Sequence, residues 1–144
     1  MIDVHALPAT EQIFTHIDPE TGVNTTIAAT SLSSHLRKIG YPIVRVPLTA
    51  WDAKVLREKR GIEKHRLARL TVLCTRYPLL ILDWLDGHTH LIADGTHSYI
   101  WQQAHGYRDA IAWLVPIAIW QPFVVSGLPE ISEEKILSSF SGIR

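Results

Sequence analysis

The sequence predicts one α+β domain, with a small mixed sheet, flanking helices and an N-terminal hairpin extension. The 144 residues are 47% hydrophobic and 19% charged, which is typical of a globular chain with one core. Strand-like and helix-like stretches alternate irregularly, without the regular βαβ rhythm of a parallel α/β fold. We expect residues 1–40 to form a hairpin and helix extension, residues 41–116 the core, and residues 117–144 a final strand and helix.

The first elements are predicted by turn chemistry. The stretches "EQIFTHI" and "VNTTIA" flank "DPETG", whose Asp-Pro and Thr-Gly pairs favour a hairpin turn. The segment "SLSSHLRKIG" is typical of a short helix that ends at Gly40. The stretch "YPIVRVPL" then alternates apolar and other residues as a strand, between Pro42 and Pro47.

Two helices are expected next. Residues 49–60 place Trp51 and Val55 at helical spacing, with Thr49 as the capping residue. After Gly61, a second helix is predicted from Ile62 to about Cys74. We expect the tryptophans to lie mostly in the core, and Cys74 to be a buried, inert thiol.

The remaining pattern predicts a second hairpin and a helix. Residues 79–84 and 88–93 should pair across the two-residue turn Asp86-Gly87, and a helix should run from Thr96 to a stop at Gly106. Three further elements are expected to close the chain: a strand in "YRDAIAWLVPIAIW", another in "QPFVV", and an amphipathic helix in "EISEEKILSSF".

Composition narrows the function classes. A net charge of zero gives no overall reason to expect nucleic-acid or membrane partners, and the single cysteine excludes an internal disulfide framework. The N-terminal residues lack the pattern of a signal peptide, and proline interrupts the apolar region 110–125. We therefore expect a cytoplasmic protein without a membrane partner. No pattern specifies an oligomeric state.

The charge is distributed unevenly. Between Asp52 and Arg76 the chain carries eight Lys or Arg residues and three acidic ones. Such a run is most often the solvated face of a helix. The alternative is a surface for phosphates, including nucleic acid bound through residues 54–76.

The stretch "LIADGTHSYIW" contains the strongest site pattern. A strand ends before Gly95, which lets the backbone turn, and a helix with unpaired N–H groups follows. The positive end of that helix attracts anions, and Thr96, His97 and Ser98 add side-chain donors, with His97 able to carry charge. The turn is thus a candidate phosphate site. The alternative is ordinary capping by Asp94 or Thr96, with His97 on the surface.

Other candidate residues are less specific. His88 and His90 share one strand face and form a possible metal pair, although an exposed strand face explains them as well. Asp94 is the better candidate for holding a metal ion that arrives with a nucleotide. Glu58 is a candidate catalytic acid or base among basic neighbours, and its alternative is an intrahelical ion pair.

From Pro42 to Pro116 the order of elements resembles the ParB/sulfiredoxin superfamily. The matching parts are a leading strand, helices, a strand–"DG"–strand hairpin, and a "DGTH" turn that opens a helix ending in glycine. Members of that superfamily bind nucleotides at this turn. The resemblance implies a nucleotide with Mg²⁺, and phosphoryl transfer or phosphodiester hydrolysis if the protein is an enzyme.

The resemblance also assigns roles to residues. Asp94 would hold a metal or act as base, residues 95–98 would cradle phosphate, and His97 and Glu58 would complete the catalytic set. Ser98 stands where the family usually has arginine, so a phosphate charge would need Arg57, Arg60 or Arg66. Because of Ser98, the alternative is a catalytically inert DNA- or protein-binding module of the same fold.

Overall fold

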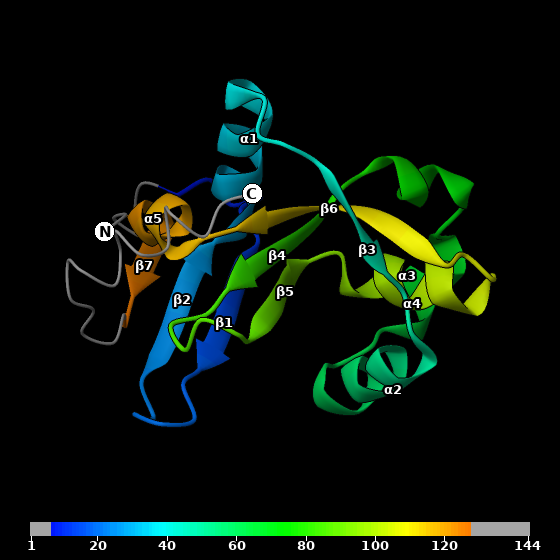
Figure 1. The fold of residues 1–144 in the computed structure, drawn as a ribbon, viewed down its shortest axis with the longest axis horizontal. Coiled ribbons are helices and arrows are strands. Elements are labelled where there is room, and N and C mark those ends of the chain that lie inside the picture. Colours follow the sequence, from blue (N-terminus) through cyan, green and yellow to red (C-terminus); the bar gives the residue numbers. More distant parts are fainter. Residues whose placement is uncertain (1–6, 128–144) are drawn as a thin grey trace.

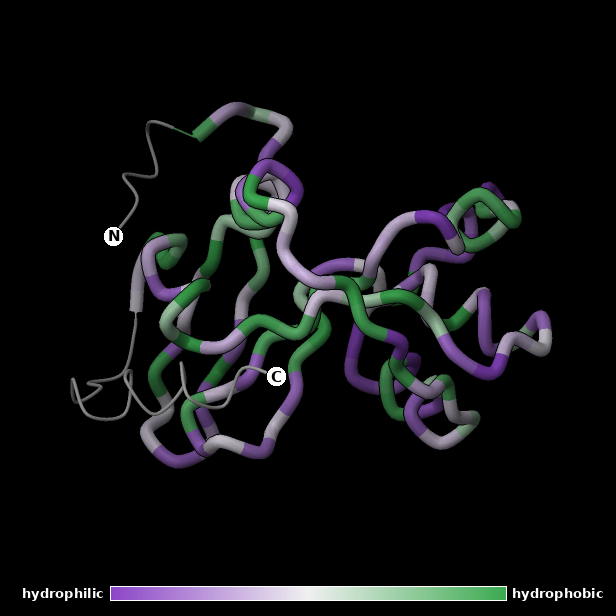
Figure 2. The backbone as a smooth tube through the Cα atoms, turned by 45° about the horizontal axis from the view of Figure 1, so that its top comes forward, coloured by the Kyte–Doolittle hydropathy of each residue, from purple (hydrophilic) through white to green (hydrophobic). Residues whose placement is uncertain are grey.

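The computed structural model describes residues 7–127, which form an α+β fold with two small sheets. One sheet has the strand order β1-β2-β7, and the other has the order β3-β6-β4-β5. Figure 1 shows β1, β2, β7 and α1 gathered on one side of the molecule and α2, α3 and α4 on the other. Strands β4 and β6 run between these two groups, and hydrophobic stretches pass through the centre of the molecule in Figure 2.

The bounds of the elements are as follows. The strands are β1 (Ile13–Ile17), β2 (Asn24–Ala28), β3 (Val44–Pro47), β4 (Leu79–Asp83), β5 (His90–Asp94), β6 (Asp109–Val115) and β7 (Val124–Ser126). The α-helices are α1 (Ala29–Ile39), α2 (Ala50–Lys59), α3 (Lys64–Arg69), α4 (Thr96–Ala104) and α5 (Ile117–Trp120), with 3-10 helices η2 (Val72–Arg76) and η3 (Gln121–Phe123).

The four-stranded sheet has apolar residues packed on both faces. Strand β4 pairs parallel with β6 and antiparallel with β5, and β3 pairs antiparallel with β6. Along β4, Leu80 and Leu82 face the core shared with the three-stranded sheet, whereas Leu79 and Ile81 face a second core under α2 and α4. Alternation of side chains between the faces thus explains the continuous apolar run of β4.

The N-terminal hairpin is part of a larger sheet. Strands β1 and β2 pair antiparallel as predicted, and β7 pairs with the other edge of β2. The hydroxyl of Thr25 donates a 2.7 Å hydrogen bond to the carbonyl of Gly127 beside this pairing. The expected N-terminal and C-terminal extensions therefore build one sheet together.

Several predicted boundaries are confirmed. Helix α1 ends at Gly40, whose φ is +65°, and the Thr49 side chain accepts the Asp52 N–H at the start of α2. Helix α4 begins at Thr96. The expected helix in residues 130–140 lies outside the described residues.

The predicted helix from Ile62 to Cys74 is wrong. The chain forms the short helix α3, becomes extended at Leu70 and Thr71, and resumes as the 3-10 helix η2. The Thr71 hydroxyl accepts the N–H of Leu73, so this residue caps a new turn and does not continue the old one. Helix α3 buries none of its residues, so no packing favours a longer helix there.

Other corrections concern Trp51, Cys74 and the end of β6. Trp51 is 69% exposed, whereas Trp84, Trp113 and Trp120 are buried as expected. Cys74 is only partly buried. The strand expected to reach residue 120 ends at Val115, because Pro116 precedes α5.

The second hairpin pairs as predicted, but its loop is longer than two residues. Trp84 and Thr89 close the loop through the Trp84 N–H and the Thr89 carbonyl, 2.9 Å apart. The Asp86 carboxylate accepts the N–H groups of His88 and Thr89, and these bonds stabilise a four-residue loop. Within residues 7–127 no helix is long and apolar enough to cross a bilayer.

Candidate phosphate-binding site

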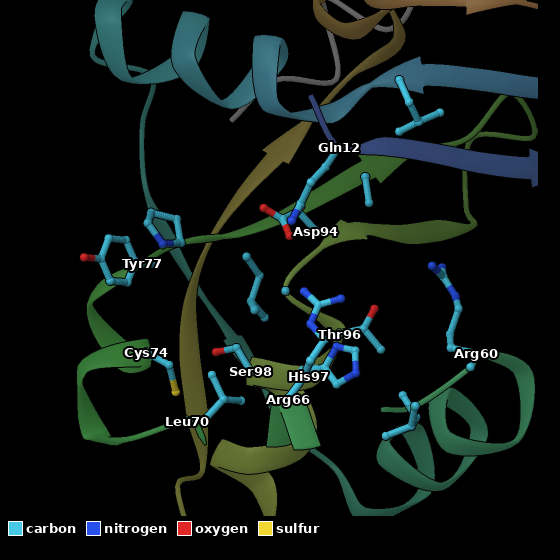
Figure 3. A pocket seen from close by; sticks show the side chains of 17 residues that line it. Gln12, Arg60, Arg66, Leu70, Cys74, Tyr77, Asp94, Thr96, His97 and Ser98 are labelled. Atoms are coloured by element: carbon cyan, nitrogen blue, oxygen red, sulfur yellow. The ribbon is translucent and has the colours of Figure 1, made fainter. Parts of the chain in front are cut away.

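A cleft of about 610 Å³ opens in front of the β5–α4 turn. Four segments line it: the turn itself (residues 93–98), the α2–α3 region with Arg60 and Arg66, residues 70–79, and the start of β1 at Gln12 and Ile13. Figure 3 shows the Arg66 side chain rising from α3 toward Asp94, with His97 beside it and Arg60 farther across the cleft. The fold therefore places two cations opposite the predicted phosphate turn.

Gly95 is required by the geometry of the turn. Its φ is +102°, a conformation that L side chains rarely adopt. A Cβ at this position would lie 2.6 Å from Cδ2 of Leu79, a buried residue of β4. The glycine thus allows both the turn and the close packing of α4 against the sheet.

The first turn of α4 has no side-chain cap. Gly95 occupies the N-cap position and Thr96 is the first helical residue, so the alternative of capping by Asp94 or Thr96 is wrong. The Gly95 N–H instead lies close enough to the Asp94 carboxylate, just before the helix, to lower the pKa of that group. Residues 96–98 line the cleft, and no side chain of the described residues caps the N–H groups at this end of α4.

His97 is held in one hydrogen-bonding state. Its Nε2 atom accepts the backbone N–H of Glu63 at 3.2 Å, which places the ring proton on Nδ1. Burial lowers the pKa of His97 below its ordinary value of 6.5, and the nearby Arg66 lowers it further, although Glu63 opposes this shift. In this arrangement His97 donates through Nδ1 as a neutral ring, and its lowered pKa means that it gains a charge only at a lower pH than an ordinary histidine does.

Asp94 interacts electrostatically with two arginines, Arg66 and Arg37. Burial raises the pKa of its carboxyl group, while the Gly95 N–H and the guanidinium groups of Arg66 and Arg37 act in the opposite direction. Burial prevails, so Asp94 takes up a proton at a higher pH than an ordinary aspartate does.

Arg60 is a half-buried cation without an acidic partner in residues 7–127. Its guanidinium lies 5.1 Å from the centre of the Phe14 ring, and burial lowers its pKa. The other arginine, Arg66, makes a long 3.9 Å ion pair with Glu63 and also interacts electrostatically with Asp94. Among the described residues, an added anion would therefore displace no ion pair of Arg60 and no short ion pair of Arg66.

Ser98 is oriented by a buried neighbour. The side-chain amide of Gln102, which is 2% exposed, donates a 2.9 Å hydrogen bond to the Ser98 hydroxyl oxygen. Because that bond uses the oxygen as acceptor, the hydroxyl hydrogen remains a donor. Ser98 thus contributes one neutral donor where the resembled family has an arginine.

Two predicted site residues lie elsewhere. Glu58 is on an exposed part of α2 and does not line the cleft, and Arg57 lines a different hollow, between α2, α3 and α4. His90 pairs with Asp83 at 2.8 Å, and His88 lies 3.5 Å from Asp86. In the described part of the chain, no three His, Cys, Asp or Glu side chains are placed to hold a metal ion.

The cleft also includes residues that sequence reasoning missed. Gln12 comes from the N-terminal hairpin, and Cys74 and Tyr77 come from the segment after α3. No local pattern identifies these residues, because only the packing of β1 and η2 against the β5–α4 turn brings them to the site. A comparison of the chain with protein-family models, curated proteins and solved structures found no match.

Proposed function

We propose that the protein binds a phosphate-bearing ligand, specifically a nucleotide, in the cleft formed by residues 94–98, Arg60 and Arg66. The observation that carries this proposal is the first turn of α4, which has no side-chain cap and lines a cleft that also contains Arg60 and Arg66. Among the described residues, Arg60 has no acidic partner, and Arg66 has only a 3.9 Å ion pair with Glu63 and a longer-range interaction with Asp94. Backbone N–H groups and guanidinium forks are the donors that recognise phosphate oxygens. The volume of about 610 Å³ lies within the range of small-molecule sites.

The proposal assigns a role to each side chain. Arg66 and Arg60 supply the charge that Ser98 lacks, and the N–H groups of residues 96–98 bind phosphate oxygens. The Nδ1–H of His97 is a further neutral donor. The resemblance to the ParB/sulfiredoxin superfamily favours the same turn and a cytoplasmic nucleotide, and remains part of this proposal.

The side chains that line the cleft suit a metal ion that binds together with the nucleotide, and they suit a permanently bound metal ion less well. Mg²⁺ commonly binds through one or two carboxylates, phosphate oxygens and water, and Asp94 is the acidic side chain among the cleft-lining residues. If the bound nucleotide is turned over, we propose phosphoryl transfer or phosphodiester hydrolysis, with Asp94 either as a ligand of Mg²⁺ or, when it holds no metal ion, as general base.

The direct experiment is calorimetric titration with a panel of nucleotides, with and without Mg²⁺. We expect saturable binding, which Arg66→Gln weakens by roughly tenfold or more because a charge-assisted bond is lost. Arg69→Gln is the matched control, since Arg69 is an exposed residue of the same helix that does not line the cleft. Equal affinities of the two variants, or no saturable binding of any nucleotide, would contradict the proposal.

One observation favours a second candidate, a nucleic-acid-binding module. Trp51 is 69% exposed on α2, and the Lys54 ammonium lies 5.8 Å from the centre of its ring. An exposed ring beside cations is a platform on which bases stack. We expect single-stranded DNA binding by this surface to weaken with salt and on Trp51→Ala, whereas nucleotide binding in the cleft survives that change.

A further inference from the structure

A second cavity, separate from the phosphate cleft, lies between α2 and the four-stranded sheet. Its volume is about 610 Å³. Its walls are largely apolar and come from β3, α2, β4, β5 and β6. Four of these wall residues pack against the core under α2 and α4 and yet are only partly buried: Val46, Leu56, Ile92 and Leu114. The core thus opens into an accessible apolar space on this side of the molecule.

The polar residues at the rim give this cavity a positive character. Asp52 is already engaged, because its carboxylate and its N–H both bond to Thr49 at the start of α2. The Nδ1 atom of His90 pairs with Asp83. At the other end of α2, Lys59 and Arg60 have no carboxylate within ion-pair distance among the described residues. The cations available for an added partner therefore lie together at one end of an apolar space.

We infer that this cavity binds a small amphipathic carboxylate, with its apolar body on the wall residues and its carboxylate against Lys59 and Arg60. An apolar body gains free energy from leaving water against Leu56, Ile92 and Leu114. A carboxylate forms charge-assisted bonds with ammonium and guanidinium groups. Neither a purely apolar ligand nor a fully hydrated anion such as inorganic phosphate would use both features.

This inference goes beyond the proposed nucleotide site and does not depend on it. Arg60 lines both cavities, so substitutions of Arg60 do not separate them. Of these two cavities, Lys59 and Leu56 line the second and not the phosphate cleft, and Arg66 lines the phosphate cleft and not the second. A substitution of any one of these three residues therefore tests ligand binding in one of the two cavities without altering the lining of the other.

The test compares 4-phenylbutyrate with 4-phenylbutan-1-ol, which has the same body but no charge, by calorimetry on the full chain. We expect saturable binding of the acid, with the alcohol weaker by roughly threefold to tenfold. Lys59→Gln should reduce this difference. Lys54→Gln, on an exposed residue of the same helix outside the cavity, should preserve it. Leu56→Trp should fill the cavity and weaken both ligands.

Two results would overturn the inference. One is the absence of saturable acid binding at millimolar concentration, and the other is equal binding of acid and alcohol to the unaltered protein. The acid–alcohol comparison needs no variant, so it decides the matter even if Leu56→Trp fails to fold. Arg66→Gln should leave acid binding unchanged, and loss of nucleotide binding in that variant would concern only the phosphate cleft.

Discussion

The backbone N–H of Glu63 donates a 3.2 Å hydrogen bond to Nε2 of His97, a residue 34 positions later in the chain. The bond joins the segment between α2 and α3 to the first turn of α4. It therefore holds the segment that contains Arg60 and Arg66 beside the β5–α4 turn. Because the ring nitrogen must accept this bond, the arrangement requires His97 to be neutral.

The first prediction concerns pH. Because the pKa of His97 is lower in the folded chain than its ordinary 6.5, the unfolded chain binds a proton first as the pH falls. The stabilisation that comes from neutral His97 should be fully present above pH 6.5. It should decline as the pH falls below 6.5 and level off below the pKa of His97 in the folded chain. His97→Gln keeps an acceptor but does not titrate, so urea unfolding should show a smaller decline over this range.

His105→Gln is the control for this experiment, since His105 is exposed at the far end of α4. Part of the decline should remain in the His97 variant, because burial also lowers the pKa of His16. An unchanged pH profile in His97→Gln would show that the Glu63 bond does not control protonation.

The second prediction concerns Gly95. Alanine at this position should destabilise the fold by roughly 2–4 kcal/mol, because it combines a positive φ with a methyl group 2.6 Å from Leu79. Gly87→Ala is a matched control, since Gly87 has a φ of +80° but nothing within 4 Å of the added Cβ. It should cost only about 1–2 kcal/mol. Equal losses in thermal unfolding would show that Leu79 moves away easily.

The third prediction concerns Asp86 in the β4–β5 loop. Burial acts to raise its pKa, but bonds from the Thr89 hydroxyl and from the Thr89 and His88 N–H groups prevail and lower it to about 2. The stabilisation is therefore present above the ordinary value of 3.8 and is lost as the pH falls toward 2. Asp86→Ala should cost about 1 kcal/mol at neutral pH and flatten this acid-dependent loss. Acid titrations of stability that coincide for the two proteins would contradict the assignment.

The fourth prediction compares two tryptophans. Trp51→Ala should change stability by no more than about 0.5 kcal/mol, because the side chain is 69% exposed. Trp120→Ala should cost roughly 3–5 kcal/mol, because Trp120 is fully buried and stacks on Trp84 with ring centres 5.6 Å apart. Chemical unfolding of both variants measures the contrast. A large loss of stability in Trp51→Ala would contradict the exposed position of the Trp51 ring.

Local chemistry in the sequence determined the α+β class, both hairpins and the helix ends at Gly40 and Thr49. Glycines that allow positive φ and side chains that accept neighbouring N–H groups act within a few residues. The β5–α4 turn at Gly95 belongs to this group, so its place between a strand and a helix was predictable. The candidate site at residues 94–98 was proposed from this turn.

Contacts between distant segments were decided only by the tertiary structure. They include the pairing of β7 with β2, the exposure of Trp51, and the position of Gln12 in the cleft. The lowered pKa of His97 comes from its burial and from Arg66, and the break at Thr71 reflects the lack of a buried face on α3. Burial and pairing depend on which segments meet in three dimensions, and the spacing of residues along one segment does not contain that information.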